Sequence, residues 1–407
     1  MKLLQINTLA NQGSVGRIAE DLGVVAKQHG YNSYFGCSTI GANGSSSDII
    51  KIGTPIDVKL HGLKTRIFDL HGFGSKGATK QFVRTVKEIN PDIIHLHNVH
   101  GYYLNIEELF HYIKTANKPV VWTFHDCWSF TGHCSYFDFV NCYKWKDQCQ
   151  QCPNKKGYPG SWWRDNSRNN FIRKRELFTG VKNMRIVTPS HWLKQLVEES
   201  FLKDYQVEVI HNGIDLERFN IADDTTLREK YNLNNQKILL GVASTWDRRK
   251  GLADFEKLSQ LISNDYSIVL VGLNESQIET LPEDIIGIAR TENVDELAGL
   301  YALADVFLNP TDVDNFPTTN IEALACGTPV VTYNTGGSPE AVDQNTGIVV
   351  EKGNVQGLWE AIQKLGNENK TYYQNVCRQR AEEMFNKQDR YHDYVELYEN
   401  VLQKNKI

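Results

Sequence analysis

Residues 310–331 read PTDVDNFPTTNIEALACGTPVV and directly follow a predicted strand that ends at Asn309. The loop carries a carboxylate at Asp314, and Thr318 and Thr319 are suited to cap the helix that comes next. The start of such a helix offers free backbone N–H groups and the positive end of the helix dipole to an anion. The stretch therefore predicts a site for an anion such as a diphosphate at the carboxyl end of a strand.

Glu322 lies about one turn inside this helix, which Gly327 is expected to end. A carboxylate in that position can accept two hydrogen bonds from a vicinal diol such as a ribose. The alternative is a capped core helix whose acids face the solvent.

Outward from this stretch, predicted strands alternate with segments of helix length. In the first half, strands are expected at residues 2–8, 91–97, 119–125 and 184–188. In the second half, they are expected at residues 207–210, 237–243, 267–271, 306–309 and 329–332. Strands separated by helices form parallel sheets that are covered on both faces. We therefore predict an α/β fold of two Rossmann-like, doubly wound parallel-sheet domains that face a cleft.

The length of 407 residues suits two or three domains at roughly 150 residues each. We expect a first domain of residues 1–185 with a C-terminal helix at about 388–407, and a second domain of residues 186–387. Residues 1–185 hold 24 Lys and Arg against 14 Asp and Glu, a net charge of +10. Residues 186–407 hold 20 against 35, a net charge of −15. Opposite signs predict two domains with different partners.

The composition and the N-terminus predict a cytoplasmic globular protein. Hydrophobic residues make up 41% and charged residues 23% of the chain, which excludes a wholly disordered or fibrous chain. The first apolar run is broken by Gln5 and Asn7, so no signal peptide is expected. No window holds the roughly 18 apolar residues that a membrane span needs.

The segment 310–331 resembles the signature of family 4 of the retaining glycosyltransferases, two carboxylates separated by seven residues. The first acid is usually Glu in that family and is Asp314 here, and the second is Glu322. The resemblance implies the GT-B fold, with an N-terminal acceptor domain and a C-terminal donor domain. It also implies retaining transfer of a sugar from a UDP- or GDP-linked donor to a hydroxyl, without a catalytic metal. The segment from Trp128 through Cys134 to Cys152 and Pro153 resembles a cysteine-rich insert of bacterial surface-polysaccharide members, which implies a lipid-linked glycan as acceptor.

The same resemblance extends to the turn that contains Lys250 and Gly251, where cations neutralise the departing diphosphate. The family places an arginine about six residues before this lysine, and that position is Ser244 here. Arg248 or Arg249 is therefore expected to supply the missing cation.

Two further loops resemble parts of the family's donor site. Glu340 ends residues 334–340, which are similar to the family's Gly-Gly loop. Gly16 and Arg17 belong to a Gly-rich turn that is expected before a helix at 17–29 and resembles the loop that closes over the diphosphate. A plain structural turn is the alternative for both.

His125 ends a predicted strand, where the family places a histidine that contacts the donor sugar near its anomeric carbon. The resemblance therefore implies a catalytic set of His125, Asp314 and Lys250. His97 and His133 are further candidates, and a structural role is the alternative for each histidine.

Three alternatives remain open at this point, one to the metal-independent mechanism and two to the function. Asp312 and Asp314 spell Asp-x-Asp, which binds a divalent metal for the diphosphate in another glycosyltransferase fold. A sugar-nucleotide 2-epimerase has a similar two-lobed fold and would convert the donor without any acceptor. A non-catalytic sugar-nucleotide-binding protein is the third alternative.

Four of the eight cysteines form a cluster with the spacing of Cys134-x7-Cys142-x6-Cys149-x2-Cys152. In a reducing compartment such a cluster is more often metal-binding than bridged. We expect structural zinc, with free thiols and disulfides as alternatives, and His133 could replace one thiolate.

One segment of the first half combines cations with apolar side chains. Its residues are Lys59, Lys64, Arg66, Lys76, Lys80, Arg84 and Lys87 with Leu60, Leu63, Ile67, Phe68, Leu70, Phe73 and Phe82. This combination suits peripheral contact with an anionic membrane, here its inner face, and a solvated helix face is the alternative. No nucleic-acid partner is expected, because no recognised fold motif accompanies the basic residues.

Overall fold

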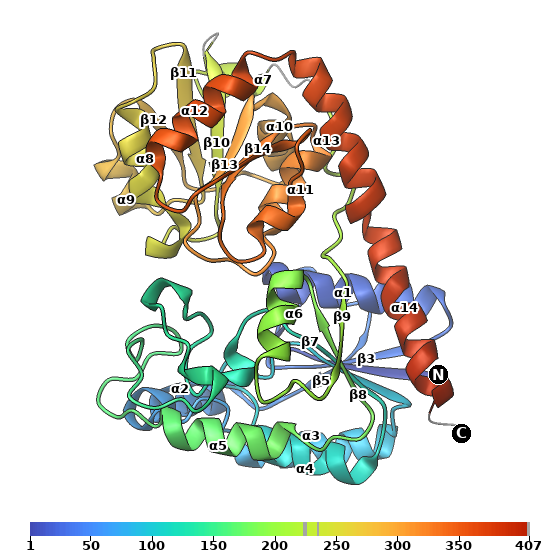
Figure 1. The fold of residues 1–407 in the computed structure, drawn as a ribbon. Coiled ribbons are helices and arrows are strands. Elements are labelled where there is room, and N and C mark those ends of the chain that lie inside the picture. Colours follow the sequence, from blue (N-terminus) through green and yellow to red (C-terminus); the bar gives the residue numbers. More distant parts are fainter. Residues whose placement is uncertain (223–225, 234–235, 405–407) are drawn as a thin grey trace. The chain divides into compact units, whose positions relative to one another are not determined.

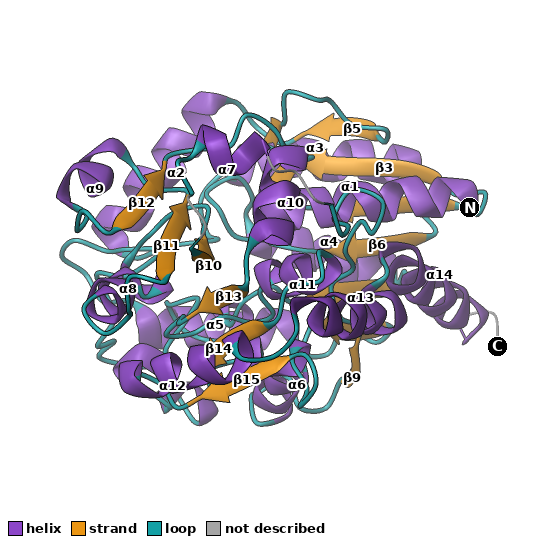
Figure 2. Ribbon diagram, turned by 90° about the horizontal axis from the view of Figure 1, so that it is seen from above, coloured by secondary structure: helices purple, strands orange, loops and turns teal. Residues whose placement is uncertain are grey.

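The computed structural model describes residues 1–222, 226–233 and 236–404. The chain divides into an N-terminal unit of Met1–His211 with the last helix from Arg390 onward, and a C-terminal unit of Asn212–Asp389. Each unit is built on its own parallel sheet, with helices on both faces (Figure 1, Figure 2). The prediction of an α/β fold with two parallel sheets is confirmed.

The sheet of the N-terminal unit has seven parallel strands in the order β5-β3-β1-β6-β7-β8-β9. The strands are β1 (Lys2–Ile6), β3 (Asn32–Cys37), β5 (Asp48–Lys51), β6 (Ile93–Leu96), β7 (Val120–Thr123), β8 (Met184–Thr188) and β9 (Gln206–Val209). The helices are α1 (Gly13–Gln28), α2 (Pro55–Phe68), α3 (Lys76–Ile89), α4 (Ile106–Ala116), α5 (Ser167–Phe178), α6 (His191–Glu198) and α14 (Lys387–Lys404). A short pair, β2 (Leu9–Ala10) and β4 (Thr39–Ile40), lies outside this sheet.

Successive side chains of a strand point to opposite faces of the sheet, and the core of this unit follows that rule. On β6, Ile93 belongs to the apolar cluster that includes α1 and α14. Its neighbour Ile94 belongs to the cluster that includes α3 and α4. Both faces are therefore buried, which explains why the central strands are apolar without alternation.

The predicted domain boundary at residues 185 and 186 is wrong, because the first sheet continues beyond it. Strand β9 pairs in parallel with β8, and Arg185 lies opposite Gln206. The strand expected at 207–210 therefore belongs to the N-terminal unit, and the boundary lies between His211 and Asn212. Helix α6 makes the crossover between the two strands, and such connections usually return the chain to the same sheet.

The charge asymmetry survives this correction. The N-terminal unit holds 29 Lys and Arg against 21 Asp and Glu, a net charge of +8. The C-terminal unit holds 15 against 28, a net charge of −13. An anion that binds the C-terminal unit must therefore be attracted by local groups that oppose the average charge.

The sheet of the C-terminal unit has six parallel strands in the order β12-β11-β10-β13-β14-β15. The strands are β10 (Lys237–Val242), β11 (Tyr266–Val271), β12 (Ile285–Ile288), β13 (Val306–Asn309), β14 (Val330–Tyr333) and β15 (Gly347–Val350). The helices are α7 (Thr226–Lys230), α8 (Leu252–Ser259), α9 (Glu275–Thr280), α10 (Val294–Leu303), α11 (Thr318–Ala325), α12 (Val355–Gly366) and α13 (Lys370–Phe385).

The strand order reverses direction between β10 and β13, which pair through Leu239 and Val306. Ligands of doubly wound sheets bind beyond the carboxyl ends of the strands at such a switch point. The loops that follow β10 and β13 are therefore neighbours, although about 65 residues separate them in sequence. The N-terminal sheet has its own switch point between β1 and β6.

The helix that was expected at residues 17–29 begins four residues earlier, at Gly13. Gly16 is therefore part of the first helical turn and not of a loop before the helix. A Cβ at Gly16 would lie 2.8 Å from the carbonyl oxygen of Leu9, so glycine lets the helix start close to the chain after β1.

The last helix, α14, packs on the N-terminal unit through one apolar face. Its buried side chains join the cluster of β1, β6, β7 and β8 and comprise Tyr391, Tyr394, Val395, Leu397, Tyr398 and Val401. The Oη of Tyr398 lies 2.7 Å from Nδ1 of the buried His95. His95 Nε2 lies 2.8 Å from Oγ1 of Thr123, which donates to the Oη of Tyr394 at 3.2 Å. These bonds fix the register of α14 on the sheet.

We predict that Tyr398→Phe lowers the free energy of unfolding of the N-terminal unit by about 1–3 kcal/mol, because His95 Nδ1 would lose its partner while buried. Urea titration followed by circular dichroism measures the change. Tyr372→Phe is the matched control, since Tyr372 is 46% exposed and should change stability by less than about 0.5 kcal/mol. Equal unfolding midpoints for wild type and Tyr398→Phe would contradict this account of α14.

Candidate active site

The turn after β10 presents three consecutive cations in the short 3₁₀ helix η4 (Arg248–Lys250). The Asp247 side chain caps it by accepting a hydrogen bond from the backbone N–H of Arg249 at 3.0 Å. Gly251 follows with a φ of 78°, and a Cβ there would lie 2.2 Å from the carbonyl oxygen of Pro310. Glycine is required here because the turn presses against the loop after β13.

Asp314 binds two of these three cations. Its Oδ2 accepts hydrogen bonds from Lys250 Nζ at 2.6 Å and from Arg249 Nη1 at 3.2 Å. Arg249 also donates to the carbonyl oxygen of Val313 at 3.0 Å, whereas the side chain of Arg248 is exposed. Of the two arginines that the sequence left open, Arg249 is the one that joins Lys250 and Asp314.

The ion cluster keeps the Asp314 carboxylate charged. Burial alone would raise the pKa of Asp314, but the neighbouring Lys250 ammonium and Arg249 guanidinium outweigh burial and hold this pKa below its usual value. Only 15% of the Asp314 side chain and 16% of the Lys250 side chain are exposed. The cluster is therefore strong enough to hold both cations in place at the carboxyl edge of the sheet.

The first acid of the Asp-x-Asp sequence also has a cationic partner. Asp312 Oδ1 lies 3.3 Å from Nζ of Lys352. Both acids of this sequence therefore face cations in the structure, Asp312 one lysine and Asp314 a lysine and an arginine.

The expectation that Thr318 and Thr319 cap helix α11 is wrong. The N-cap residue is Pro317, no side chain caps the helix, and Thr318 is its first residue. Pro317 has the extended backbone of an N-cap residue, and the Phe316-Pro317 step restricts where the helix can begin. The backbone N–H groups of the first turn therefore keep no side-chain acceptor from the cap position.

Glu322, on the same helix, accepts a hydrogen bond from the phenol of Tyr301 at 2.8 Å. Tyr301 comes from α10 and is fully buried. Burial raises the pKa of Tyr301 well above its ordinary value, and Glu322 raises it further, so the phenol remains a donor. The contact orients a half-buried carboxylate. No motif of the sequence indicated Tyr301, because it lies on another helix.

The Gly-Gly loop packs directly on the backbone of Asp314. A Cβ at Gly336 would lie 1.9 Å from the Asp314 carbonyl oxygen, which accepts a hydrogen bond from the N–H of Gly337 at 3.0 Å. Glu340 follows on the short helix η5 (Ser338–Ala341). The loops after β10, β13 and β14 therefore converge on Asp314, as expected for one site.

In the N-terminal unit, the candidates Gly16 and Arg17 lie on the first turn of α1. Arg17 is an exposed side chain whose Nε donates to the carbonyl oxygen of Gly13 at 3.3 Å. It is available to an anion at the start of the helix.

His125 follows β7, and its Nε2 lies 3.2 Å from Nδ1 of His97, which follows β6. The Nε2 of His97 is in turn 3.1 Å from Oε1 of Gln5 on β1. Burial lowers the pKa of His125 to about 4, although Asp126 opposes the shift. The two histidine candidates are therefore adjacent, and His125 is neutral at pH 7.

Asp126 is fixed by a partner that the sequence did not indicate. Its Oδ2 lies 3.0 Å from Nε2 of His100, and its Oδ1 accepts from the N–H of Trp128 at 2.9 Å. Burial alone would raise the pKa of Asp126, but His100 lowers it below its ordinary value. This pair supports the loop that carries His125.

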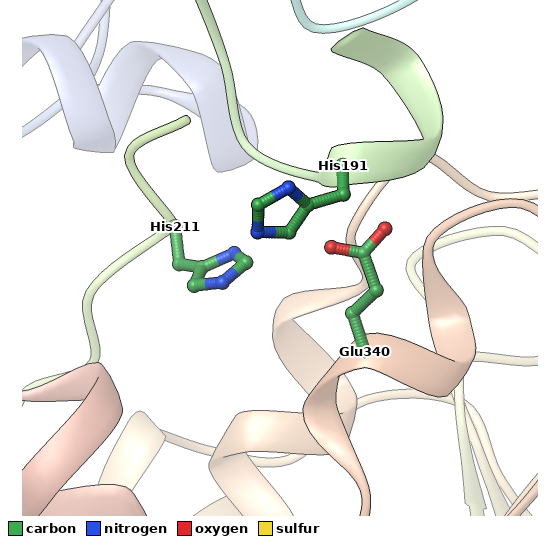
Figure 3. A group of neighbouring side chains, drawn as sticks. All are labelled: His191, His211 and Glu340. Atoms are coloured by element: carbon green, nitrogen blue, oxygen red, sulfur yellow. The ribbon is translucent and has the colours of Figure 1, made fainter. Parts of the chain in front are cut away.

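Two further histidines of the N-terminal unit lie at the carboxyl ends of its last strands (Figure 3). His191 begins α6 after β8, and His211 follows β9 with its Nδ1 2.8 Å from the carbonyl oxygen of Pro189. Their ring centroids are 6.0 Å apart. Glu340, also drawn in Figure 3, belongs to the C-terminal unit. No motif indicated the two histidines.

The four clustered cysteines lie in an irregular segment of the N-terminal unit, and all are free thiols. Cys134, Cys142, Cys149 and Cys152 line one small cavity together with His133. His133 Nδ1 contacts a carboxylate oxygen of Asp69 at 2.5 Å. His133 therefore belongs to the cysteine cluster and not to the group of His97 and His125.

Both halves of the chain match known family models. Residues 42–218 match the model of Glycosyltransferase Family 4, and residues 236–368 match the model of Glycosyl transferases group 1. The chain belongs to the family 4 glycosyltransferases. This membership decides against the epimerase and the non-catalytic binding protein.

Over 422 aligned residues the glycosyltransferase is 25% identical to the putative colanic acid biosynthesis glycosyl transferase WcaC of Escherichia coli (strain K12), covering 98% of this chain and 100% of that protein. Its structure is similar to sucrose-phosphate synthase from Thermosynechococcus elongatus, with a TM-score of 0.72, 17% identity and 99% coverage of both chains. It is also similar to Anabaena Alr3699/HepE in complex with UDP, with a TM-score of 0.70, 15% identity and coverage of 98% and 100%. At this identity the likeness establishes the fold, which is GT-B as the resemblance implied.

Within the described part of the glycosyltransferase, no helix is both long and apolar enough to span a bilayer.

We predict that the glycosyltransferase loses stability as the pH falls from about 6.5 to 4. Five described histidines of the N-terminal unit have a lowered pKa, with burial as the first cause, and comprise His61, His71, His95, His97 and His125. Only His133 has a raised pKa among those described. The unfolded chain therefore binds more protons in this range, so the free energy of unfolding rises with pH by at most about 1.4 kcal/mol per pH unit for each such histidine.

Chemical denaturation at pH 5.0, 5.5, 6.0 and 6.5 measures this slope. His125→Gln should reduce it, because one histidine with a lowered pKa is removed, while the exposed His111→Gln should leave it unchanged. A flat profile in the wild-type protein would contradict the neutral state of the buried histidines.

Proposed function

We propose that this protein transfers a sugar from a nucleotide diphosphate-sugar to a hydroxyl acceptor, with retention at the anomeric carbon, in the synthesis of a bacterial surface polysaccharide. The observation that supports this proposal most strongly is the cluster of Asp314, Lys250 and Arg249 beside the start of α11. It supplies two positive groups at the switch point of a doubly wound sheet, where an anionic ligand is expected.

These groups bind the donor and stabilise its leaving group. Lys250 and Arg249 stabilise the charge that develops on the departing diphosphate, and the uncapped N–H groups of α11 at Thr318 and Thr319 assist them. Glu322, oriented by Tyr301, accepts hydrogen bonds from the ribose hydroxyls. UDP or GDP carries the sugar, and the similarity in fold to a UDP-bound protein supports a nucleotide donor.

Asp314 and His125 orient the donor sugar. A neutral His125 can donate or accept a hydrogen bond to a sugar hydroxyl without adding charge near the anomeric carbon. Gly16 and Arg17 contact the diphosphate from the N-terminal unit, and Glu340 contacts the donor from the C-terminal unit. No protein nucleophile is assigned, and the leaving diphosphate accepts the proton of the acceptor hydroxyl on the same face.

The acceptor is a glycan carried on a lipid diphosphate. The name of the E. coli relative, which refers to colanic acid biosynthesis, supports a polysaccharide pathway. The net charge of +8 on the N-terminal unit supports binding of an anionic carrier there.

A membrane-facing surface supports this acceptor. Helix α2 exposes Ile56 by 68%, Leu60 by 60% and Leu63 by 47% beside exposed lysines. The backbone N–H of the exposed Trp162 donates to the carbonyl oxygen of Arg66 at 2.7 Å, which docks a Trp-Trp pair against α2. Aromatic and basic side chains around apolar ones are typical of proteins that bind the surface of an anionic bilayer.

The apolar part of this surface differs from the prediction, because Phe73 and Phe82 are buried in the core. Helix α3 exposes Lys80, Arg84 and Lys87, but none of its large apolar side chains is exposed. We name the apolar and basic set around α2 the α2 surface. It comprises Ile56, Lys59, Leu60, Leu63, Lys64, Arg66, Phe68, Trp162, Trp163 and Arg164. The protein would then work at the inner face of the membrane as a peripheral enzyme.

Incubation with a panel of UDP- and GDP-linked sugars, with and without bacterial membrane extract, tests the function. Release of nucleoside diphosphate that requires the extract supports transfer, and NMR of the new linkage reports retention. No extract-dependent release with any donor, or an inverted linkage, would overturn the proposal. Activity lost in EDTA and restored by Mg²⁺ or Mn²⁺ would overturn metal independence.

We predict that Arg249→Ala weakens binding of the preferred nucleoside diphosphate by about 10-fold to 150-fold, because a hydrogen bond to a charged group contributes about 1.5–3 kcal/mol. Isothermal titration calorimetry measures the dissociation constant. Arg248→Ala is the matched control and should stay within about threefold of wild type, because its side chain is exposed. The reverse order of the two variants would refute the assignment.

We predict that the protein binds vesicles containing anionic phospholipid and releases them as salt rises. The double substitution Leu60→Ser and Trp163→Ser should lower the bound fraction at least about fivefold in a flotation assay, since both side chains are largely exposed on the α2 surface. Ile221→Ser, at a 41% exposed position in the C-terminal unit, is the control. Equal binding to neutral vesicles, or no loss in the double variant, would contradict this surface.

A further inference from the structure

The segment between β7 and α5 is held together without regular secondary structure. Its described residues 124–166 contain only the short 3₁₀ helices η1 (Trp128–Phe130), η2 (Asp138–Val140) and η3 (Lys144–Lys146). The segment nevertheless buries five aromatic side chains, Phe124, Trp128, Phe130, Phe137 and Trp145. A long irregular segment with a fixed core commonly depends on a covalent or metal cross-link.

A small cavity lies inside this segment, lined by Cys134, Cys142, Cys149, Cys152 and His133. It leaves about 10 Å³ for the centre of a water-sized sphere, which is room for a single atom. The thiols are not joined as disulfides. Five potential ligands of a soft metal therefore surround a space that suits one ion.

His133 is prepared as a ligand by a buried carboxylate. Its Nδ1 lies 2.5 Å from Oδ1 of Asp69, and neither side chain is exposed to solvent. The other carboxylate oxygen of Asp69 accepts from the N–H of Asn166 at 2.8 Å, so the acid is itself held in place. Metal-binding histidines usually have such a carboxylate behind them, which fixes the ring and its tautomer.

The opposite nitrogen of this ring has no partner. His133 is 2% exposed, and its Nε2 makes no hydrogen bond within the described residues. A buried ring nitrogen without a partner is costly unless an unrecorded group binds it. His133 lines the same cavity as Cys134, Cys149 and Cys152. The unpartnered Nε2 therefore belongs to the same group of ligands as the cysteines.

All four cysteines of the cluster line this cavity, and Cys134 is the one that is buried. The Sγ of Cys149 accepts the backbone N–H of Gly132 at 3.2 Å. Cys142 lines the same cavity, and His133 takes its place in the ligand set proposed below.

We propose that His133 Nε2 and the thiolates of Cys134, Cys149 and Cys152 form a structural zinc site that cross-links residues 133–152. Three sulfurs and one imidazole suit tetrahedral zinc, and four protein ligands leave no open position for catalysis. No three of the described ligand atoms in this group lie within 4.8 Å of one another. Tetrahedral binding at about 2.3 Å per sulfur draws the side chains inward around the cavity.

A buried lysine supports the wall of this cavity. Lys174 is 1% exposed and donates hydrogen bonds to the carbonyl oxygens of Trp128 at 2.7 Å and Thr131 at 3.1 Å. Burial lowers the pKa of Lys174 well below its ordinary value, whereas Cys149, Asp126 and Cys134 oppose this shift. Thr131 lines the cavity, so Lys174 holds part of its backbone in place.

Zinc analysis of the purified full-length protein tests the proposal without any substitution. We expect about one zinc per chain by plasma mass spectrometry, released by a mercurial thiol reagent but not by brief washing. Reloading with Co²⁺ should give the visible bands of a tetrahedral thiolate site. Less than about 0.1 zinc per chain with all thiols reduced would overturn the proposal, and so would a Cys134–Cys152 disulfide found by non-reducing peptide mapping.

Substitutions then test the ligand set. Cys149→Ser should lose the zinc, and the matched control Cys142→Ser should keep one zinc and an unchanged cobalt spectrum. Asp69→Asn should weaken zinc binding about 10-fold to 100-fold in competition with a chelator, since it disturbs only the carboxylate behind His133. If Cys142→Ser loses the zinc while His133→Ala keeps it, four cysteines bind the ion and the proposed set is refuted.

Discussion

The ion cluster of Asp314 with Lys250 and Arg249 is the interaction on which the donor site depends. It exists because β10 and β13 are neighbours in the sheet, so the loops after them meet at its carboxyl edge. Gly251 and Gly336 allow the loops to approach to distances that a side chain would prevent. A carboxylate that is mostly buried keeps its charge because two cations face it, and the same cations are the groups that we propose for the diphosphate. Local charge thus overrides a unit whose net charge is −13.

The N-terminal unit uses the opposite electrostatics at the ends of its central strands. Burial lowers the pKa of His97 and His125, and hydrogen bonds run from Gln5 through His97 to His125. A second chain of bonds links His95 to Tyr398 of α14. Because the last helix is bonded beside the histidines, its removal would expose polar groups that are now paired in the core.

The sequence could predict the parts of the site that lie close together along the chain. The stretch 310–331 contains a strand end, a carboxylate, a helix start and a second carboxylate, so a site for an anion could be predicted there from spacing, while the roles of its residues came from the resemblance. The start of α11 was also predicted, but not its capping, because a threonine was expected where Pro317 takes the N-cap position. The choice between Arg248 and Arg249 depends on which way a short 3₁₀ turn points its side chains, and adjacent residues give no pattern for that.

Long-range contacts account for most of what could not be predicted. Tyr301 reaches Glu322 from another helix, and Asp69 reaches His133 from the end of α2. The domain boundary was misplaced because a strand with no special composition, β9, completes the first sheet by pairing with β8. Similarly, the sequence predicted that Phe82 belongs to a basic membrane-facing segment, but tertiary packing buries its side chain. Periodicity describes one element at a time and cannot decide which elements pack together.

The most direct test of the central claim, a nucleotide-sugar held by the C-terminal unit, is a comparison of two ligands by calorimetry. The preferred nucleoside diphosphate and its 2′,3′-dideoxy analogue are titrated into wild type and into Glu322→Ala. The wild type should bind the dideoxy analogue about 10-fold to 150-fold more weakly, the value of a hydrogen bond to a charged group, and Glu322→Ala should hardly distinguish the two ligands. Equal affinity of the wild type for both ligands, or full discrimination in the variant, would contradict the placement of the ribose at Glu322.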